Sequence, residues 1–570
     1  MKSNVERQDY AGSASCEVCH SEIYKKWAAS PMRRMTRLPS PSHGEPPFDG
    51  RAFHFKGDTV TLSTHDEARF MRVERKDEPA EVYKVTRVIG GRYREDFAGR
   101  QVREESGASK PIAGPDEPVL PVSWMLFDQT LRYKGYSVMV KERPHLGAHG
   151  APWRKTCIFC HNTVPYLSTV FDDLDGGKKT YQGSVTDGLL PDARRWRVEP
   201  KDGDLLAAAL RAEVLRLDPK RKSKGIKLED ELADAIDVTA ARFDEQHLVE
   251  VGIGCESCHN GSRGHVEEQR RLPSFAPRGP LVKTVTPDHK EGTKAEQTTH
   301  VCARCHTVLF SRYPYTWEGG QRKTNPGGST INSGEARDFL LGGCASQMTC
   351  TACHDPHTED SKAKLAELGT LAGNGVCVKC HGKYQGDAAL GAHTHHDPKG
   401  QGSACLACHM PKKQTGLGYD LGRYHRIGSP TDRDRVEKDR PIECALCHED
   451  KSVKSLVGSM EQWWSKKYSR RALEVLYGED LDATVISSTL AHGKPHELIT
   501  AAGVIKERNQ KGNEVMLAEH LSHEFPLVRY YARAALEKTT GRKVDIDLDG
   551  DEKSIKAGAS AWLAAGGKKR

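Results

Sequence analysis

The sequence has few of the apolar residues from which a protein core is normally built. Only 37% of its 570 residues are hydrophobic and 7% are aromatic, and the mean hydropathy is −0.65. A chain of this length should form about two to four domains, each with an interior to fill. We therefore expect groups other than side chains to occupy part of the core.

Two kinds of partner are excluded by what else is missing. No run approaches the roughly 18 consecutive apolar residues that a membrane-spanning helix needs, so we expect no transmembrane segment. The net charge of +7 is small for this size, and no long block of Lys and Arg is present. We therefore expect no nucleic-acid partner.

Cysteine, in contrast, is abundant and regular. Of the 17 cysteines, 16 fall in eight copies of the pattern C-x-x-C-H, which is the attachment signature of c-type haem. The cysteines of the eight motifs are Cys16 and Cys19, Cys157 and Cys160, Cys255 and Cys258, Cys302 and Cys305, Cys350 and Cys353, Cys377 and Cys380, Cys405 and Cys408, and Cys444 and Cys447. The histidines that follow them are His20, His161, His259, His306, His354, His381, His409 and His448.

The chemistry of haem attachment explains each residue of the motif. Two thiols at this spacing add to the two vinyl groups of one porphyrin, and the adjacent imidazole becomes the proximal iron ligand. A zinc ribbon also uses C-x-x-C, but tetrahedral zinc ligation does not require histidine after every second cysteine. A disulfide framework would not impose one spacing eight times. The sequence therefore predicts eight covalently bound c-type haems.

Eight haems would account for the missing apolar residues. Their flat, apolar rings would fill the interior, with short helices and loops around them. The motifs from Cys302 onward begin only 27 to 48 residues apart, which should keep consecutive haems close together. Since each ferric haem adds about one positive and two negative charges, the holoprotein should carry a net charge of roughly −1 when oxidised and −9 when reduced.

Covalent haem attachment takes place outside the cytoplasm. The first residues, MKSNVERQDYAGSASC, lack the apolar region of an export signal, so we expect that the signal has been trimmed or replaced. The expected location is the periplasm, the cell surface or the extracellular space.

The pattern of residues divides the chain into four segments. These are an N-terminal haem-motif segment (1–47), a β-containing insertion without motifs (48–140), a multihaem domain with seven motifs (141–450) and a C-terminal helical domain (451–570). Period-two runs at 51–64 and 80–97 predict strands. Segments 23–30, 204–217, 228–243, 470–478, 496–509 and 526–541 predict helices. The C-terminal domain resembles a HEAT-type repeat, with Pro526 opening a helix and Gly541 closing it, although an unrelated helical tail fits equally well. The expected fold class is mainly α with much irregular structure.

Five phrases resemble the multihaem superfamily that contains cytochrome c-554, hydroxylamine oxidoreductase and the octahaem nitrite and tetrathionate reductases. They are CEVCHSEIYKKWAAS, GIGCESCHNGSRGH, CTACHDPH, HTHHDPKGQGSACLACHMP and GRYHRIGSP, within residues 11–450. The resemblance implies packed haems, most of which carry a second histidine. It suggests as second ligands His265, His357, His395 or His396, and His425.

Other histidines are weaker candidates for iron ligation. His145, His149, His247 and His300 come next, followed by His43, His54, His65 and His289. His492, His496, His520 and His523 are expected to be surface residues of the tail.

The sequence departs from this superfamily in two ways. Met32 stands where relatives have histidine in W-x-x-S-x-H, so either methionine ligates an iron or one haem has a different or missing ligand. No motif reads C-x-x-C-K, so the lysine-ligated haem of the nitrite reductases is not visible.

Three functions are consistent with this sequence. The first is electron transfer between redox partner proteins, including other cytochromes, with an oligomer or filament of copies as one arrangement. The second is an octahaem oxidoreductase in which one open iron acts on nitrite, hydroxylamine or tetrathionate. The third is a scaffold that docks partners through the C-terminal helices. The missing lysine motif favours electron transfer. Met32, which stands where relatives have a histidine, keeps the oxidoreductase as an alternative, because one iron would then have a free position.

Overall fold

The computed structural model describes residues 2–39, 48–112, 114, 116–134, 139–146, 152–176, 178, 190–222, 227–242, 245–307, 312–331 and 333–567. The chain forms two compact units, each built from separate segments. Unit 1 comprises residues 1–133, 146–308 and 345–359, and unit 2 comprises residues 134–145, 309–344 and 360–570. Unit 1 holds five of the C-x-x-C-H motifs and unit 2 holds the last three.

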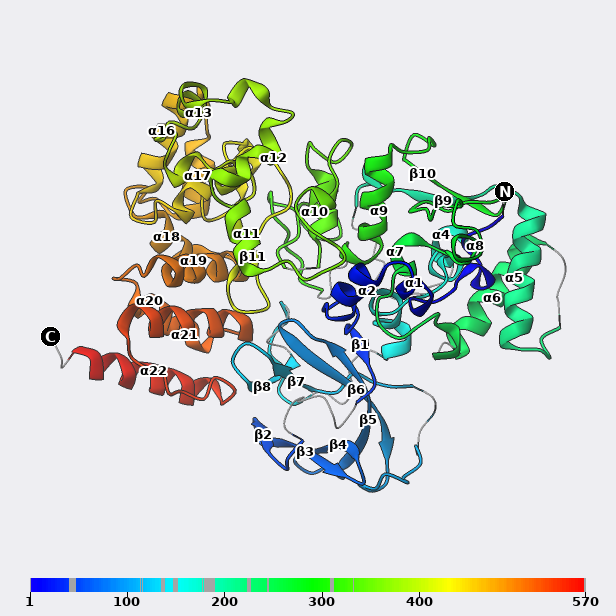
Figure 1. Ribbon diagram of the computed structural model, residues 1–570. Helices are drawn as coiled ribbons and strands as arrows, with labels where there is room; N and C mark the ends of the chain where they lie inside the picture. Colours follow the sequence, from blue (N-terminus) through cyan, green and yellow to red (C-terminus); the bar gives the residue numbers. More distant parts are fainter. Residues whose placement is uncertain are drawn as a thin grey trace. The chain divides into compact units, whose positions relative to one another are not determined.

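An antiparallel sheet forms the β part of unit 1 (Figure 1). Its strands follow one another in chain order, and the short strand β1 pairs with β5. The rings of Phe55 and Tyr133 stack at 4.6 Å, which brings the two edge strands together so that the sheet nearly closes on itself. The strands are β1 (Thr36–Arg37), β2 (Ala52–Phe55), β3 (Asp58–His65), β4 (Ala68–Glu74), β5 (Glu81–Gly90), β6 (Arg94–Val102), β7 (Val122–Met125) and β8 (Thr130–Tyr133).

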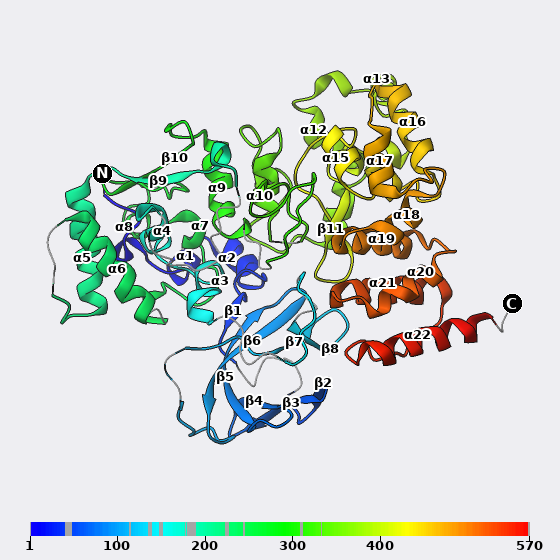
Figure 2. The same cartoon turned by 180° about the vertical axis from the view of Figure 1, so that it is seen from behind.

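Short helices make up most of the rest of unit 1. The two longest described helices of this unit, α5 and α6, lie side by side in both views (Figure 2). They bury Leu206, Leu210 and Ile236 in the core around Trp153. The helices are α1 (Ala14–Glu17), α2 (Ser21–Ala28), α3 (Ile158–His161), α4 (Phe171–Leu174), α5 (Gly203–Leu217), α6 (Leu228–Arg242), α7 (Glu256–His259), α8 (Arg263–Glu267) and α9 (Lys294–His306), and β9 (Arg197–Pro200) pairs with β10 (Val282–Val285).

Unit 2 is mainly helical. One small hairpin is present, formed by β11 (Lys412–Thr415) and β12 (Leu421–Arg423). The helices are α10 (Glu335–Leu341), α11 (Lys362–Leu368), α12 (Gly375–Val378), α13 (Asp387–Thr394), α14 (Cys405–His409), α15 (Arg433–Lys438), α16 (Val453–Trp464), α17 (Arg470–Tyr477), α18 (Val485–His492), α19 (Pro495–Arg508), α20 (Glu514–Glu519), α21 (Pro526–Thr540) and α22 (Glu552–Gly567).

The C-terminal helices pack on the haem-motif segment of their own unit. Helix α19 is buried along most of its length and lies against α21 and β11. The hydroxyl of Thr500 donates a hydrogen bond of 3.0 Å to the carbonyl oxygen of Lys413. Pro526 begins α21 and Gly541, at φ +66°, ends it, as the sequence predicted. The expected HEAT-type repeat stays a prediction.

The predicted helices and strands are confirmed, but the balance between them differs from the expectation. The sequence led us to expect a mainly α fold with a small β insertion. The structure is mixed, with 42% of the described residues in helices and an eight-stranded sheet. The difference arises because segments such as 68–74 and 122–133 add strands that extend the two predicted runs into one sheet. None of the helices in the described part of the chain combines the length and apolar character needed to cross a bilayer.

Candidate haem-binding sites

Each C-x-x-C-H motif forms a single tight turn. In six of them the backbone N–H of the histidine donates to the carbonyl of the first cysteine at 2.9 to 3.1 Å. The other two motifs are helical: the motif at Cys302 forms the last turn of α9, and the motif at Cys405 is α14 itself. Residues spaced three and four apart lie on one face of such a turn. Both thiols and the imidazole of a motif are therefore presented together, as attachment to one porphyrin requires.

Motifs that are distant in sequence meet through their cysteines. In unit 1 the thiol of Cys16 hydrogen-bonds Cys255 and lowers the pKa of Cys255 to about 7, and Cys160 likewise lowers the pKa of Cys305 to about 6. In unit 2 a hydrogen bond from Cys377 lowers the pKa of Cys405 to about 7. The attachment points of several motifs within each unit are thus in direct contact.

Four pairs of histidines face each other, each pair joining a motif histidine to a second histidine. Their ring centroids are 5.8 to 6.3 Å apart and their planes lie within 27° of parallel. The pairs are His20 with His265, His259 with His357, His409 with His393, and His448 with His396.

This spacing fits one metal ion held between two imidazoles. A metal–imidazole bond is about 2 Å long, so two nitrogens on one ion lie about 4 Å apart and their ring centroids about 6 Å apart. Burial, followed by the charge of the facing histidine, lowers the pKa of His259, His393 and His448. These rings are thereby kept in the neutral form that binds iron.

Backbone carbonyls fix the orientation of three of the candidate ligands. The Nδ1 atom of His396 lies 2.7 Å from the Thr394 oxygen, and those of His409 and His425 lie 2.9 and 3.0 Å from the oxygens of Gly428 and Arg423. Since a carbonyl only accepts, Nδ1 must carry the proton and Nε2 keeps its lone pair. His425 therefore has the tautomer of an iron ligand, as proposed from its phrase.

One turn presents ligands to two different motifs. His393, in the last turn of α13, faces His409, and His396, three residues later, faces His448. Between them His395 adopts a left-handed conformation at φ +55°. We refer to residues 393–396 as the ligand turn.

Aromatic side chains surround the ligand turn. The indole N–H of Trp464 donates to the His393 carbonyl at 3.0 Å, and Tyr384 stacks on the His393 ring at 4.2 Å. His395 stacks on Trp463 at 5.0 Å and meets Trp464 edge to face. Of the two alternatives proposed from the sequence, His396 therefore faces a motif histidine, and His395 lies between two indoles.

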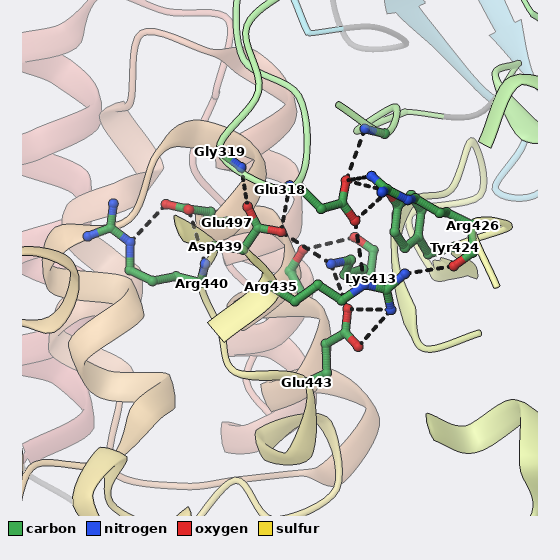
Figure 3. Close-up of polar contacts among 12 residues, drawn as sticks. Glu318, Gly319, Lys413, Tyr424, Arg426, Arg435, Asp439, Arg440, Glu443 and Glu497 are labelled. Carbon is green, nitrogen blue, oxygen red and sulfur yellow. Dashed lines mark hydrogen bonds and ion pairs between the residues drawn. The ribbon is translucent and has the colours of Figure 1, made fainter. Parts of the chain in front are cut away.

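A buried charged cluster lies in the chain between the motifs of His409 and His448 (Figure 3). The ammonium group of Lys413 is 2.7 Å from Glu443 and 3.5 Å from Asp439, and Arg435 also pairs with Glu443 at 3.1 Å. Glu443 directly precedes Cys444. These ion pairs therefore join the chain just after one motif to the chain just before the next.

An aromatic side chain and a second acid complete this cluster. The hydroxyl of Tyr424 donates to Glu318 at 2.8 Å, and Arg426 pairs with the same carboxylate at 3.0 Å. Lys413 lies over the ring of Trp317 at 4.3 Å. No sequence pattern pointed to these residues, because isolated charged residues usually belong to solvated surfaces.

The remaining candidates lie in varied surroundings. His300 is half-buried and stacks on Trp196 at 5.0 Å, and desolvation together with the charge of Arg304 lowers the pKa of His300 to about 3. His247 is buried and His145 is exposed. His54, His65 and His289 are exposed and contact Thr59, Glu105 and Glu199. His43 and His149 lie outside the described residues.

His496 differs from the expectation for the C-terminal histidines. His496 is not a surface residue, since it is 1% exposed and its Nδ1 lies 2.7 Å from the Tyr313 hydroxyl. It is buried because α19, which carries it, packs against α18, α21 and β11.

Met32 is half-buried. Because the motif histidine His20 already faces His265, ligation by Met32 remains a prediction for another iron.

Comparison with known proteins supports the haem chemistry. Residues 343–386, which contain the motifs at Cys350 and Cys377, match the family model of the doubled CXXCH motif. The crystal structure of the outer cell wall cytochrome OcwA aligns with 93% of this chain and all of that chain, at 14% identity and a TM-score of 0.39, too low to show a shared fold. No curated protein matches the sequence. The paired motifs make this chain a multihaem c-type cytochrome.

Proposed function

We propose that the chain is an octahaem electron-transfer protein in which at least four irons are held between two histidines. The observation that supports this most strongly is the set of four facing histidine pairs at 5.8 to 6.3 Å. Haem supplies one-electron redox chemistry when bound. The residues that would hold it are the eight motifs and the facing histidines.

The protein's own part is to hold the ligands in place. An iron with two histidine ligands has no vacant position for a small molecule, which favours electron transfer over substrate chemistry. Carbonyl bonds to Nδ1 and ring stacking hold the imidazoles before and after the electron moves. Contacts between the cysteines of neighbouring motifs favour short paths between haems within each unit.

The expected setting follows from the chemistry of attachment. Covalent haem attachment outside the cytoplasm favours the periplasm, the cell surface or the extracellular space. The partners would be other redox proteins, including cytochromes and further copies of this chain. The resemblance to the cytochrome c-554 and hydroxylamine oxidoreductase superfamily is compatible with this role.

A haem count combined with a spin count tests the proposal. A pyridine haemochrome assay should give eight haems per chain, all resistant to extraction with acidic acetone. Electron paramagnetic resonance of the oxidised protein should give at least four low-spin signals of the two-histidine type. Five haems or fewer would refute the stoichiometry. A high-spin iron that binds cyanide or nitrite rapidly, with turnover, would instead favour the octahaem oxidoreductase.

A further inference from the structure

A basic surface lies next to the ligand turn. The loop that joins α16 to α17 and the first turn of α17 carry Lys466, Lys467, Arg470 and Arg471, all exposed. Arg470 pairs with Glu474 at 2.7 Å. Within the described part of the chain, Lys466, Lys467 and Arg471 have no carboxylate within ion-pair distance. We call residues 466–471 the basic loop.

The basic loop is joined to the candidate iron ligands through Trp464. It begins two residues after Trp464, whose indole donates to the His393 carbonyl. The neighbouring Trp463 stacks on His395 and is still 41% exposed. On α17, Val475 lies one turn beyond Arg471 on the same face and is 77% exposed. Exposed apolar groups rimmed by polar residues are typical of interaction surfaces.

The sign of the charge identifies the partner. With eight haems bound, the whole protein should carry a net negative charge, whereas the basic loop carries four cationic side chains against the three carboxylates that contact it, those of Glu437, Glu461 and Glu474. Local charge of one sign steers an oppositely charged partner and raises its rate of association.

We infer that the basic loop, with Trp463 and Val475, is the docking surface for an acidic redox protein that exchanges electrons at the ligand turn. This inference rests on the proposed electron-transfer function. In each encounter the partner loses one electron and one iron of this chain gains it, passing from ferric to ferrous, or the reverse. No proton or other atom is transferred.

The wild-type holoprotein provides the first test. Its reduction is followed in a stopped-flow instrument with anionic flavin mononucleotide hydroquinone and with the cationic methyl viologen radical, at increasing ionic strength. If the basic loop governs the encounter, the rate with the anionic reductant falls as salt is added. If the net negative charge governs it, that rate rises instead, and the inference is wrong.

Charge reversal provides the second test. The variant Lys466→Glu, Lys467→Glu, Arg471→Glu should bind a fluorescein-labelled hexaglutamate peptide about tenfold more weakly and react several-fold more slowly with the anionic reductant. A matched control, Lys201→Glu, Lys220→Glu, Lys290→Glu, changes the total charge equally at exposed positions of unit 1. It should change both quantities less than about twofold. Equal effects of the two variants would refute the docking surface.

The outcome is separable from that of the proposed function. Each variant should keep the visible spectrum and the low-spin signals of the wild type, because none of the six residues belongs to, or contacts, the four facing histidine pairs. A wild-type protein without two-histidine signals would refute the proposed ligation, whatever the peptide binding. Intact signals with no loss of peptide affinity would refute only the docking surface.

Discussion

The Nε2 atoms of His396 and His448 face each other at 3.5 Å. Two neutral imidazoles with both lone pairs directed at each other would repel, whereas a metal ion between them would bind both. The carbonyl of Thr394 fixes the proton of His396 on Nδ1, so the His396 lone pair is directed at His448. The facing nitrogens of His396 and His448 therefore fit a metal ion bound between them.

The first prediction concerns His393, which faces His409. Replacing it with alanine should convert one low-spin haem to high-spin without loss of covalent haem, because the cysteines of that motif are unchanged. Electron paramagnetic resonance measures the spin count, and the haemochrome assay measures the haem count. His289→Ala, at an exposed histidine paired with Glu199, is the control. An unchanged low-spin count in the His393 variant would show that this residue is not a ligand.

The second prediction concerns the charged cluster around Lys413. Replacing Lys413 with methionine leaves Glu443 and Asp439 buried without their ammonium partner, so we expect the free energy of unfolding to fall by about 3–5 kcal/mol. Guanidinium unfolding followed by circular dichroism measures the loss. Lys454→Met, whose pair with Asp482 is exposed, should cost less than about 1 kcal/mol. Similar losses in both variants would contradict a structural role for the cluster.

The third prediction is a pH dependence at Asp338. Burial raises the pKa of the Asp338 carboxyl to about 7, whereas in the unfolded chain its pKa is about 4. Between these values the folded protein holds a proton that unfolding releases. The free energy of unfolding contributed by this group therefore falls as pH rises, by up to about 1.4 kcal/mol per pH unit.

The variant Asp338→Asn isolates this group. It should remove that slope, so the stability of the wild type relative to the variant should decline from about pH 5 to about pH 7 and then level off. Parallel stability curves for the two proteins would mean that Asp338 is ionised in the fold throughout this range.

The fourth prediction is that haem is needed for unit 1 and the motif-bearing part of unit 2 to fold. Too few side chains are apolar to offset the chain entropy of loops and short helices. Chain produced without the haem-attachment machinery should be degraded by protease through residues 16–448, which span the eight motifs. The C-terminal helices, which bury an apolar core around Leu498, Ile499 and Tyr531, should remain partly helical. A compact, protease-resistant apoprotein would contradict this expectation.

Local patterns in the sequence were sufficient for the motifs and most regular elements. A C-x-x-C-H turn involves five consecutive residues, and α5, α6, α19 and α21 follow directly from apolar periodicity. The family phrases pointed to His265, His357 and His396 as second ligands, and each of them faces a motif histidine. His393 was missed because its partner is set by how the chain folds back, although the spacing of His393 and His396 within one helical turn was a visible signal.

The charged cluster could not have been predicted in this way. Lys413, Glu443 and Arg435 are ordinary charged residues in the sequence, and only their burial makes them partners. The extent of the sheet was likewise underestimated, since short strands such as β7 and β8 are stabilised by neighbours rather than by their own pattern. His496 was misplaced for the same reason, because burial of a histidine depends on the helices packed around it.

The discontinuous make-up of unit 1 has a consequence for biogenesis. Its last segment, 345–359, supplies both the Cys350 motif and His357, which faces His259 nearly a hundred residues earlier. If the chain is exported from its N-terminus, unit 1 would stay incomplete until residue 359 had crossed, by which time residues 134–145 and 309–344 of unit 2 would already have emerged. The haem-attachment machinery would thus encounter the first four motifs on an immature, accessible chain, and ligand exchange at His259 would be one of the late steps of maturation.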